Sequence, residues 1–308
     1  HEEVNSMKMN FFKLIPFILV LFMMGSLVLN TAGNTLDRVI LASKPFTESY
    51  ILTEIMVLLL QHDTNLDVEY KNIEGGTTSI LHPAILQGEI DIYPEYTGTA
   101  WQDVLKKENI VSDPQELFNL VQAEYEEQFQ LVWLPTFGFN DTFTLAVKAD
   151  LAEKLNIKTY SDLAKVSNQL IFGAEPDFFE RKDGFDNLVE TYGFNFKNTK
   201  QMAIALKYPA ILSGEVDVIN AFSTDGLLKR YDMIILQDDK NFFPSYLAAP
   251  VVRKSVLEIH PEVGDSLKKL AGLIDENLMI DMNYQVDEEK KDPQIVAREF
   301  LTNQGLIE

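Results

Sequence analysis

The stretch PAILQGEIDIYPEYTGT at Pro83–Thr99 has a close copy 126 positions downstream, PAILSGEVDVINAFSTDG at Pro209–Gly226. In each copy a helical pattern stops at a glycine, Gly88 or Gly214, and an alternating apolar segment begins two residues later. Glycine commonly ends a helix, and an Ile-x-Ile or Val-x-Val pattern is typical of a buried strand. The sequence therefore predicts one helix–glycine–strand unit that occurs twice in the fold.

The rest of the chain also alternates between strand and helix patterns. Residues 39–42 are apolar and precede a helical pattern, and a similar alternation restarts near Thr142 with no low-complexity linker before it. Such alternation predicts an α/β fold of mainly parallel sheets joined by crossover helices. A restart without a linker predicts that the chain crosses into a second lobe and returns. We expect residues 35–140 and 232–308 to form lobe 1 and residues 141–231 to form lobe 2.

The composition excludes several classes of protein. The formal net charge is −21, which disfavours binding to nucleic-acid phosphates. The chain has no cysteine, and its four histidines (His1, His62, His82 and His260) are too scattered for a local zinc motif. The pair Gly75-Gly76 is not followed by the Gly-Lys-Ser/Thr of a nucleotide-binding loop. We therefore expect no metal, no cofactor and no nucleic-acid partner.

Residues 1–34 contain a nearly unbroken apolar run from Leu14 to Leu29, preceded by Lys8 and Lys13. A run of this length is typical of a signal-peptide core and slightly short for a membrane span of about 20 residues. Because no good small-residue cleavage site follows, we expect an uncleaved anchor at the extracytoplasmic face of the membrane. The alternatives are a cleaved signal and the last span of a permease fused upstream.

The two copies diverge where each predicted strand ends. In open α/β sheets, ligands bind beyond the carboxyl ends of the strands. Tyr96 and Phe222 fall there, at equivalent positions of the two copies, and Thr99 and Thr224 follow them. The repeat therefore predicts a cleft with one ring from each lobe. Asp225 is expected to cap the helix that begins at the next residue.

From about Val39 onward, the sequence resembles the substrate-binding component of bacterial osmoprotectant ABC importers. The resemblance is carried by the motifs ASKPFTESYILTEI, YPEYTGTAW, GFNDTF, FFERKDGFDNL, FSTDG and DDKNFFPSY, which are specific only in combination. It implies a two-lobed periplasmic-binding-protein fold of type II. It also implies a quaternary-ammonium ligand held in a cage of aromatic rings, where a cation that has no N–H is attracted to the ring faces.

By motif position, the resemblance implies a ligand site of nine residues. The cage would consist of Tyr96, Phe143, Phe222 and Tyr246, Arg181 would pair with a ligand carboxylate, and Lys44, Thr99, Asn140 and Thr224 would be polar contacts. For each ring the alternative is simple core packing. For Arg181 the alternative is an ion pair with Asp183 or Glu180.

Two of the cage positions depart from the family pattern, in which tyrosine is usual where this chain has Phe143 and Phe222. The resemblance therefore leaves glycine betaine, carnitine, choline and ergothioneine as candidate ligands, and it implies an ABC permease as partner. An enzyme on the same scaffold is disfavoured, because no nucleophile–base pair or cofactor loop accompanies the motifs. A ligand-sensing receptor domain is the other alternative.

Overall fold

The computed structural model of the chain describes residues 37–109, 111 and 113–308. The expected anchor or signal segment, residues 1–34, lies outside this part. Residues Val39–Glu308 form one compact unit. No helix among the described residues is both long enough and apolar enough to cross a membrane.

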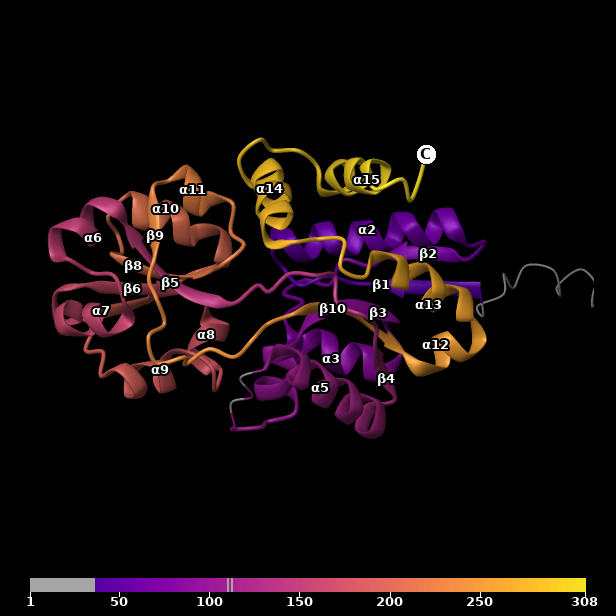
Figure 1. The fold of residues 1–308 in the computed structure, drawn as a ribbon, viewed down its shortest axis with the longest axis horizontal. Helices are drawn as coiled ribbons and strands as arrows, with labels where there is room; N and C mark the ends of the chain where they lie inside the picture. The colour runs from indigo at the N-terminus through magenta and orange to yellow at the C-terminus, as the bar shows by residue number, and fades with distance from the viewer. Residues whose placement is uncertain (1–36, 110, 112) are drawn as a thin grey trace, which may run out of the picture. The chain divides into compact units, whose positions relative to one another are not determined.

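The first sheet has five strands in the order β2-β1-β3-β10-β4. These are β1 (Arg38–Leu41), β2 (Asp67–Tyr70), β3 (Ile92–Tyr96), β4 (Leu131–Trp133) and β10 (Ala248–Arg253). The helices around it are α2 (Thr47–Asp63), α3 (Thr78–Gln87), α4 (Thr97–Thr99), α5 (Pro114–Phe129), α12 (Lys254–Ile259), α13 (Pro261–Leu267), α14 (Glu276–Asp287) and α15 (Pro293–Asn303). Figure 1 shows α2 on one side of this sheet and α3 and α5 on the other.

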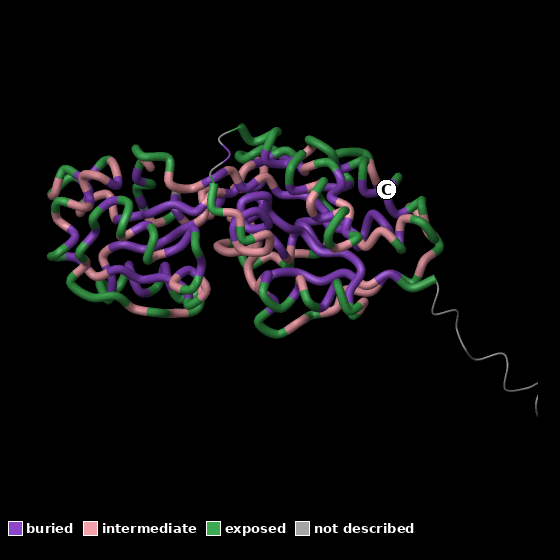
Figure 2. Tube along the Cα trace, turned by 90° about the horizontal axis from the view of Figure 1, so that it is seen from below, coloured by how far each residue is buried: buried purple, intermediate pink, exposed green. Residues whose placement is uncertain are grey.

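Successive side chains of a strand point to opposite faces of the sheet, so each strand packs against both helical layers. On β3, Ile92 and Tyr96 belong to the apolar cluster that contains α2, whereas Tyr93 belongs to the cluster of α3 and α5. All of β3 is buried, as expected for a central strand covered by helices on both faces. In Figure 2 the buried segments accordingly run through the middle of the fold, and exposed residues lie outside them.

The second sheet has the order β7-β6-β8-β5-β9. Its strands are β5 (Phe143–Lys148), β6 (Ile171–Ala174), β7 (Asn198–Gln201), β8 (Val218–Phe222) and β9 (Met233–Ile235). Its helices are α6 (Ala149–Leu155), α7 (Tyr160–Val166), α8 (Pro176–Glu180), α9 (Phe185–Tyr192), α10 (Lys207–Leu212) and α11 (Leu227–Arg230). Both sheets with their flanking helices agree with the predicted α/β class.

The sheets add two details to the expectation. Strand β10 runs antiparallel to β3 and β4, and β5 runs antiparallel to β8 and β9, so each mainly parallel sheet contains an antiparallel strand. Both antiparallel strands follow a segment that arrives from the other sheet and therefore enters from the opposite end. Strand β9 pairs with β5, so the second sheet extends past residue 231, where the sequence placed the end of lobe 2. The division into lobes itself stays a prediction.

The chain crosses between the sheets twice, through residues 134–142 and 236–247, and these two segments are hydrogen-bonded to each other. The Asp141 N–H donates to the Tyr246 carbonyl at 3.1 Å. The Tyr246 N–H donates to the Asn140 side-chain oxygen at 2.6 Å. A bridge between Asn140 and Leu247 continues the pairing.

The repeated unit is present in both sheets. Gly88 is the C-cap of α3 and Gly214 follows the Ser213 C-cap of α10, with left-handed φ values of 75° and 76°, and β3 and β8 begin at the equivalent residues Ile92 and Val218. Asp91 and Asp217 also match: each side chain accepts the N–H of a neighbouring strand, Ile40 at 2.9 Å and Ile171 at 2.8 Å. The similarity of sequence therefore reflects the same local construction in each sheet.

Candidate ligand-binding site

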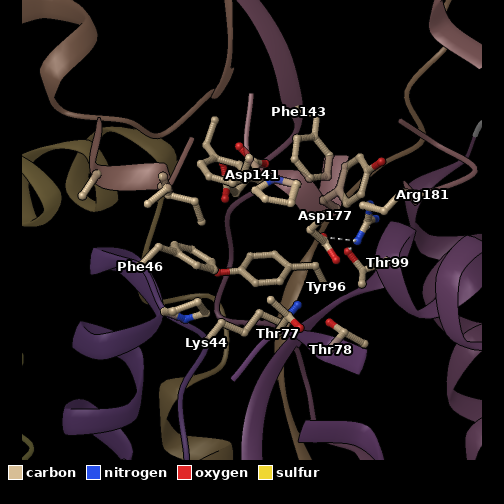
Figure 3. A pocket seen from close by; sticks show the side chains of 18 residues that line it. Lys44, Phe46, Thr77, Thr78, Tyr96, Thr99, Asp141, Phe143, Asp177 and Arg181 are labelled. Carbon is tan, nitrogen blue, oxygen red and sulfur yellow. Dashed lines mark hydrogen bonds and ion pairs between the residues drawn. The ribbon is translucent and has the colours of Figure 1, made fainter. Parts of the chain in front are cut away.

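A cavity of about 380 Å³ lies where β3 and β8 end, and aromatic rings from both sheets line it. The rings are those of Phe46, Tyr96, Phe143, Phe222 and Tyr246. Figure 3 shows the rings of Phe46, Tyr96 and Phe143 around a common space. The carboxyl ends of the two repeated strands thus meet at one cavity, as the sequence predicted.

Strand register places four of these rings. Tyr96 and Phe222 are the last residues of β3 and β8. Phe143, the first residue of β5, lies directly opposite Phe222 in the antiparallel ladder. Tyr246 precedes β10, whose Ala248 lies opposite Tyr96. Phe46 comes instead from the extended residue that precedes α2.

The five rings form a continuous series. Phe46 lies 6.1 Å from Tyr96 and stacks on Phe222 at 5.3 Å with an interplanar angle of 18°. Phe222 lies 5.2 Å from Phe143, and Phe143 meets Tyr246 at 5.5 Å with an angle of 86°. Such separations are those of favourable aromatic contacts, so each ring helps to hold the next in position.

Three of the rings also carry a cation of the protein itself. Lys44 Nζ lies 4.8 Å from the centre of the Tyr96 ring, Lys207 Nζ 4.8 Å from that of Phe222, and the Arg181 guanidinium 5.1 Å from that of Phe143. Each of these cations is paired with a buried carboxylate, namely Glu95, Glu175 and Asp183 respectively. Each of these ion pairs beside a ring therefore has a net charge close to zero.

Arg181 is buried and forms a two-pronged ion pair with Asp183. Its Nε donates to Asp183 Oδ1 at 2.7 Å and its Nη2 to Oδ2 at 2.5 Å. Nη2 also contacts Thr99 Oγ1 at 3.3 Å, and Nη1 lies 3.7 Å from Asp177 Oδ2. The ion-pair alternative for Arg181 is thus present in the structure, while the same guanidinium lines the cavity.

The other predicted polar contacts are divided between the cavity and its surroundings. Lys44 and Thr99 line the ring-lined cavity. Asn140 does not: its side-chain oxygen accepts from the Tyr246 N–H and from Ser245 Oγ at 3.1 Å, so it positions Tyr246. Thr224 does not line this cavity either, because its hydroxyl donates to Glu48 at 2.6 Å. Both side chains are better described as supports of the site.

Asp225 does not cap α11, contrary to expectation. Its carboxylate turns back to accept the Phe222 N–H at 3.0 Å and the Tyr208 hydroxyl at 2.8 Å. Gly226 precedes the helix, with no side-chain cap. The carboxylate therefore fixes the end of β8 and with it the backbone of Phe222.

Two buried acids stand beside the rings, Glu48 of α2 and Asp141 of the first crossing segment. Glu48 accepts the Tyr96 hydroxyl at 2.6 Å as well as that of Thr224. Burial raises the pKa of Glu48 to about 7 despite these donors. Burial, reinforced by the nearby charge of Glu48, raises the pKa of Asp141 well above its ordinary value.

Sequence reasoning missed Phe46, Asp141 and Asp177 as cavity residues. Phe46 and Asp141 lie inside the motifs ASKPFTESYILTEI and GFNDTF, close to residues that were chosen, but nothing in the motifs themselves marked these two side chains as cavity residues. Asp177 lies at the start of α8, and no local pattern distinguished it. Among the described residues, no group of three or more acidic or histidine side chains is arranged to hold a metal ion.

Comparison with known proteins places this geometry in context. Residues 37–303 match the family model of the substrate binding domain of ABC-type glycine betaine transport systems. The ergothioneine transport permease/ergothioneine binding protein EgtU of Helicobacter pylori (strain G27) is 42% identical over 267 residues, which cover 87% of this chain and 48% of that protein. The chain thus spans about half the length of that relative.

Two further matches extend over nearly the whole of the compared protein. The carnitine transport binding protein OpuCC of Listeria monocytogenes serotype 1/2a (strain 10403S) is 36% identical over 304 residues, 96% of this chain and 98% of that protein. A crystal structure of a glycine betaine/carnitine/choline ABC transporter superposes with a TM-score of 0.72 at 33% identity, covering 88% of this chain and 100% of the other.

Proposed function

The chain belongs to the family of substrate-binding domains of ABC-type glycine betaine transport systems, and on this premise we propose that it captures a quaternary-ammonium compound outside the cytoplasm. The candidates are glycine betaine, carnitine, choline and ergothioneine. The family and the relatives described above are transport proteins, and we propose capture and delivery to a permease rather than catalysis.

The observation that carries this proposal is the series of five rings around one cavity. A trimethylammonium group has no N–H, so it gains little from hydrogen-bond acceptors and is stabilised instead by ring faces. Burial of its methyl groups against the same rings adds the hydrophobic term. The cavity offers both, and the carboxylates of Asp141 and Asp177 line it as well.

The opposite end of such a ligand would meet Lys44, Thr99 and Arg181, which also line the cavity. Arg181 is already engaged by Asp183, so a ligand carboxylate would approach the Nη1 side, where Asp177 is 3.7 Å away. A carboxylate there would compete with Asp177, whose pKa is raised by burial. Protonation of Asp177 would favour the ligand carboxylate in this competition.

The partner in this proposal is an ABC permease, and the location is the extracytoplasmic face of the membrane. Support comes from the family and from the name of the Helicobacter pylori relative, which joins a permease and a binding protein. Whether residues 1–34 act as an anchor, a signal or a permease span can be read from the N-terminus of the mature chain, determined on membrane and soluble fractions.

A titration with matched ligands tests the proposal. Choline and 3,3-dimethylbutanol have the same shape, but only choline is charged. If the rings recognise a cation, calorimetry will show choline binding at least about tenfold more tightly, because each desolvated cation–π contact contributes up to about 2 kcal/mol. Equal affinities would reduce the cavity to an apolar pocket and contradict the proposal. The same titration with glycine betaine, carnitine and ergothioneine ranks the candidates.

A further inference from the structure

The two sheets are built in the same way, strand by strand. In order across the sheet, β2, β1, β3, β10 and β4 of the first correspond to β7, β6, β8, β5 and β9 of the second. In each sheet the fourth strand is the antiparallel one, and it follows a segment that crosses from the other sheet. In Figure 1, α3 lies below its sheet and the equivalent α10 above its sheet, as a two-fold rotation in the plane of the picture requires.

Each copy of the repeated unit carries three exposed apolar residues that are spaced three apart. Residues three apart are neighbours on a helix surface, so each set forms a continuous apolar ridge. The first ridge lies on α3, and the second begins on the short turn Ile204–Leu206 and continues along α10, 126 positions downstream. Ridge 1 consists of Ile80, Pro83 and Leu86, and ridge 2 of Leu206, Pro209 and Leu212.

Single exposed apolar residues are normal on a protein surface, but the ridges are repeated. Nine large apolar side chains are exposed among the described residues, and four of them are the isoleucine and leucines of the ridges. Their exposed fractions are 42% and 46% in ridge 1 and 55% and 41% in ridge 2. Core packing explains why Ile85 and its equivalent Ile211 are apolar, since both are fully buried. It does not explain the ridges, which therefore indicate a contact made by both copies.

Both ridges begin at the edge of the ring-lined cavity. Thr77 and Thr78, at the start of α3, line this cavity, and so do Ala203–Ala205, directly before ridge 2. The ridges belong to different sheets, and the cavity lies where strands of both sheets end. A partner that contacts both ridges therefore lies beside the cavity, where a ligand leaving it would be received.

A carboxylate follows each ridge at the equivalent position, three residues after its last member. Glu89 and Glu215 have side chains that are 55% and 54% exposed, and each is paired with a lysine, Lys71 Nζ at 3.7 Å and Lys200 Nζ at 2.9 Å respectively. Exposed ion pairs contribute little to stability, so either carboxylate is free to exchange its lysine for a cation of a partner. The matching carboxylates predict a basic group beside each apolar contact on the partner.

We propose that the two ridges are the docking surface for the ABC permease, and that each ridge contacts one of two equivalent halves of that permease. The inference rests on the proposed function, which names the permease as partner but not the surface that meets it. A partner with two-fold symmetry presents the same site twice, so it fits two copies of one ridge. A partner with a single site would use one ridge and leave the other without a role.

Photocrosslinking in cells tests the surface on the full-length protein. Ile80 or Leu206 is replaced by p-benzoylphenylalanine, and the matched control is Ile295 of α15, which is 52% exposed and outside the ridges. We expect both ridge positions, but not the control, to crosslink to the transmembrane part of the permease, identified by mass spectrometry. Crosslinks from only one ridge, to a second copy of this chain or to no permease would overturn the inference.

The variants Leu86→Gln and Leu212→Gln supply the second arm, with Ile295→Gln as control. Neither leucine lines the ring-lined cavity, so calorimetry should show unchanged affinity for the quaternary-ammonium compound that the parent binds most tightly. Uptake of the same compound by cells, at a concentration below saturation, should fall at least about fivefold for each ridge variant, as for loss of one interface hot spot, and further for the double variant. Unchanged uptake with the double variant would count against the ridges. If no such compound binds the parent, the proposed function fails, whereas the crosslinks still decide the docking surface.

Discussion

Phe222 shows how one side chain can serve both the fold and the site. Its ring stacks on Phe46, contacts Phe143 and has the Lys207 ammonium 4.8 Å from its centre. It is also partly exposed to the cavity that it lines. Packing and cation recognition therefore make separable demands on the residue: packing requires apolar bulk, and recognition requires a ring.

Substitution at Phe222 distinguishes these demands. Phe222→Leu keeps apolar bulk but loses the ring, so we expect affinity for choline to fall about tenfold, as for one desolvated cation–π contact. Phe222→Tyr keeps the ring and should retain binding. Thermal unfolding run alongside shows whether both variants fold. If Phe222→Leu binds choline as tightly as the parent, the residue has only a packing role.

Arg181 allows a test that depends on the ligand. Arg181→Lys keeps a positive charge near Asp183 but loses the planar fork that holds two oxygens at once. We expect glycine betaine, which has a carboxylate, to lose about 1.5–3 kcal/mol of binding free energy, and choline, which has none, to lose much less. Parallel titrations measure both. Equal losses would assign Arg181 to the structural pair with Asp183 alone.

Because the helix–glycine–strand unit occurs twice, the effects of substituting its two glycines can be compared directly. Gly88 and Gly214 have nearly the same left-handed φ, but an added Cβ would lie 3.0 Å from Arg253 Nη1 at Gly88 and would meet nothing within 4 Å at Gly214. Arg253 Nη1 also donates to Asp91 at 3.0 Å.

We therefore expect Gly214→Ala to cost about 1–2 kcal/mol of unfolding free energy, the cost of a left-handed backbone for an L-residue. Gly88→Ala should cost more, because the Arg253 guanidinium beside Asp91 must also shift to relieve the 3.0 Å contact with the added Cβ. Denaturant unfolding of the two variants gives the comparison. A Gly88 variant as stable as the Gly214 variant would show that Arg253 adjusts without loss.

The two copies of this unit also show which residues of the site could be predicted from the sequence. Tyr96 and Phe222 end the equivalent strands of the two copies, so the topology of the repeat was enough to predict that both rings line one cavity. Phe143 and Tyr246 were found through motif resemblance, because their partners lie far away in the chain. Phe46 lies just before a helix and looks like any core phenylalanine; only the direction of α2 brings it to the cavity. Asn140 lies in a motif, but its side chain turns to Tyr246, which is 106 residues away.

The contacts of Glu48 link the stability of the whole domain to pH. Glu48 of α2 accepts from Thr224, which follows β8 of the other sheet, and its pKa is raised from an ordinary value of 4.5 to about 7 by burial. An acid with a raised pKa holds its proton in the folded state after the unfolded chain has released it. The contribution to stability is therefore complete below pH 4.5 and is lost as the pH rises through about 7.

Glu48→Gln, which cannot ionise, should remove this part of the pH dependence. We expect the parent to lose stability between about pH 4.5 and 7 more steeply than the variant does, and urea unfolding at several pH values measures the two slopes. Asp141, whose pKa is also raised, keeps a residual slope of the same sign in the variant. Parallel curves for the two proteins would mean that Glu48 does not titrate in this range.

The paired crossing segments have a mechanical consequence. The Asp141 N–H donates to the Tyr246 carbonyl, and the Tyr246 N–H donates to the Asn140 side chain. Because of these bonds, we expect the two connections between the sheets to move together as a short two-stranded ribbon. A ribbon bends readily about one axis and resists torsion, so opening and closing should follow a single hinge direction. Tyr246 is part of this ribbon and also lines the ring-lined cavity. The site therefore lies next to the segments about which such a motion would turn, so a small rotation should change the distance between the rings only gradually.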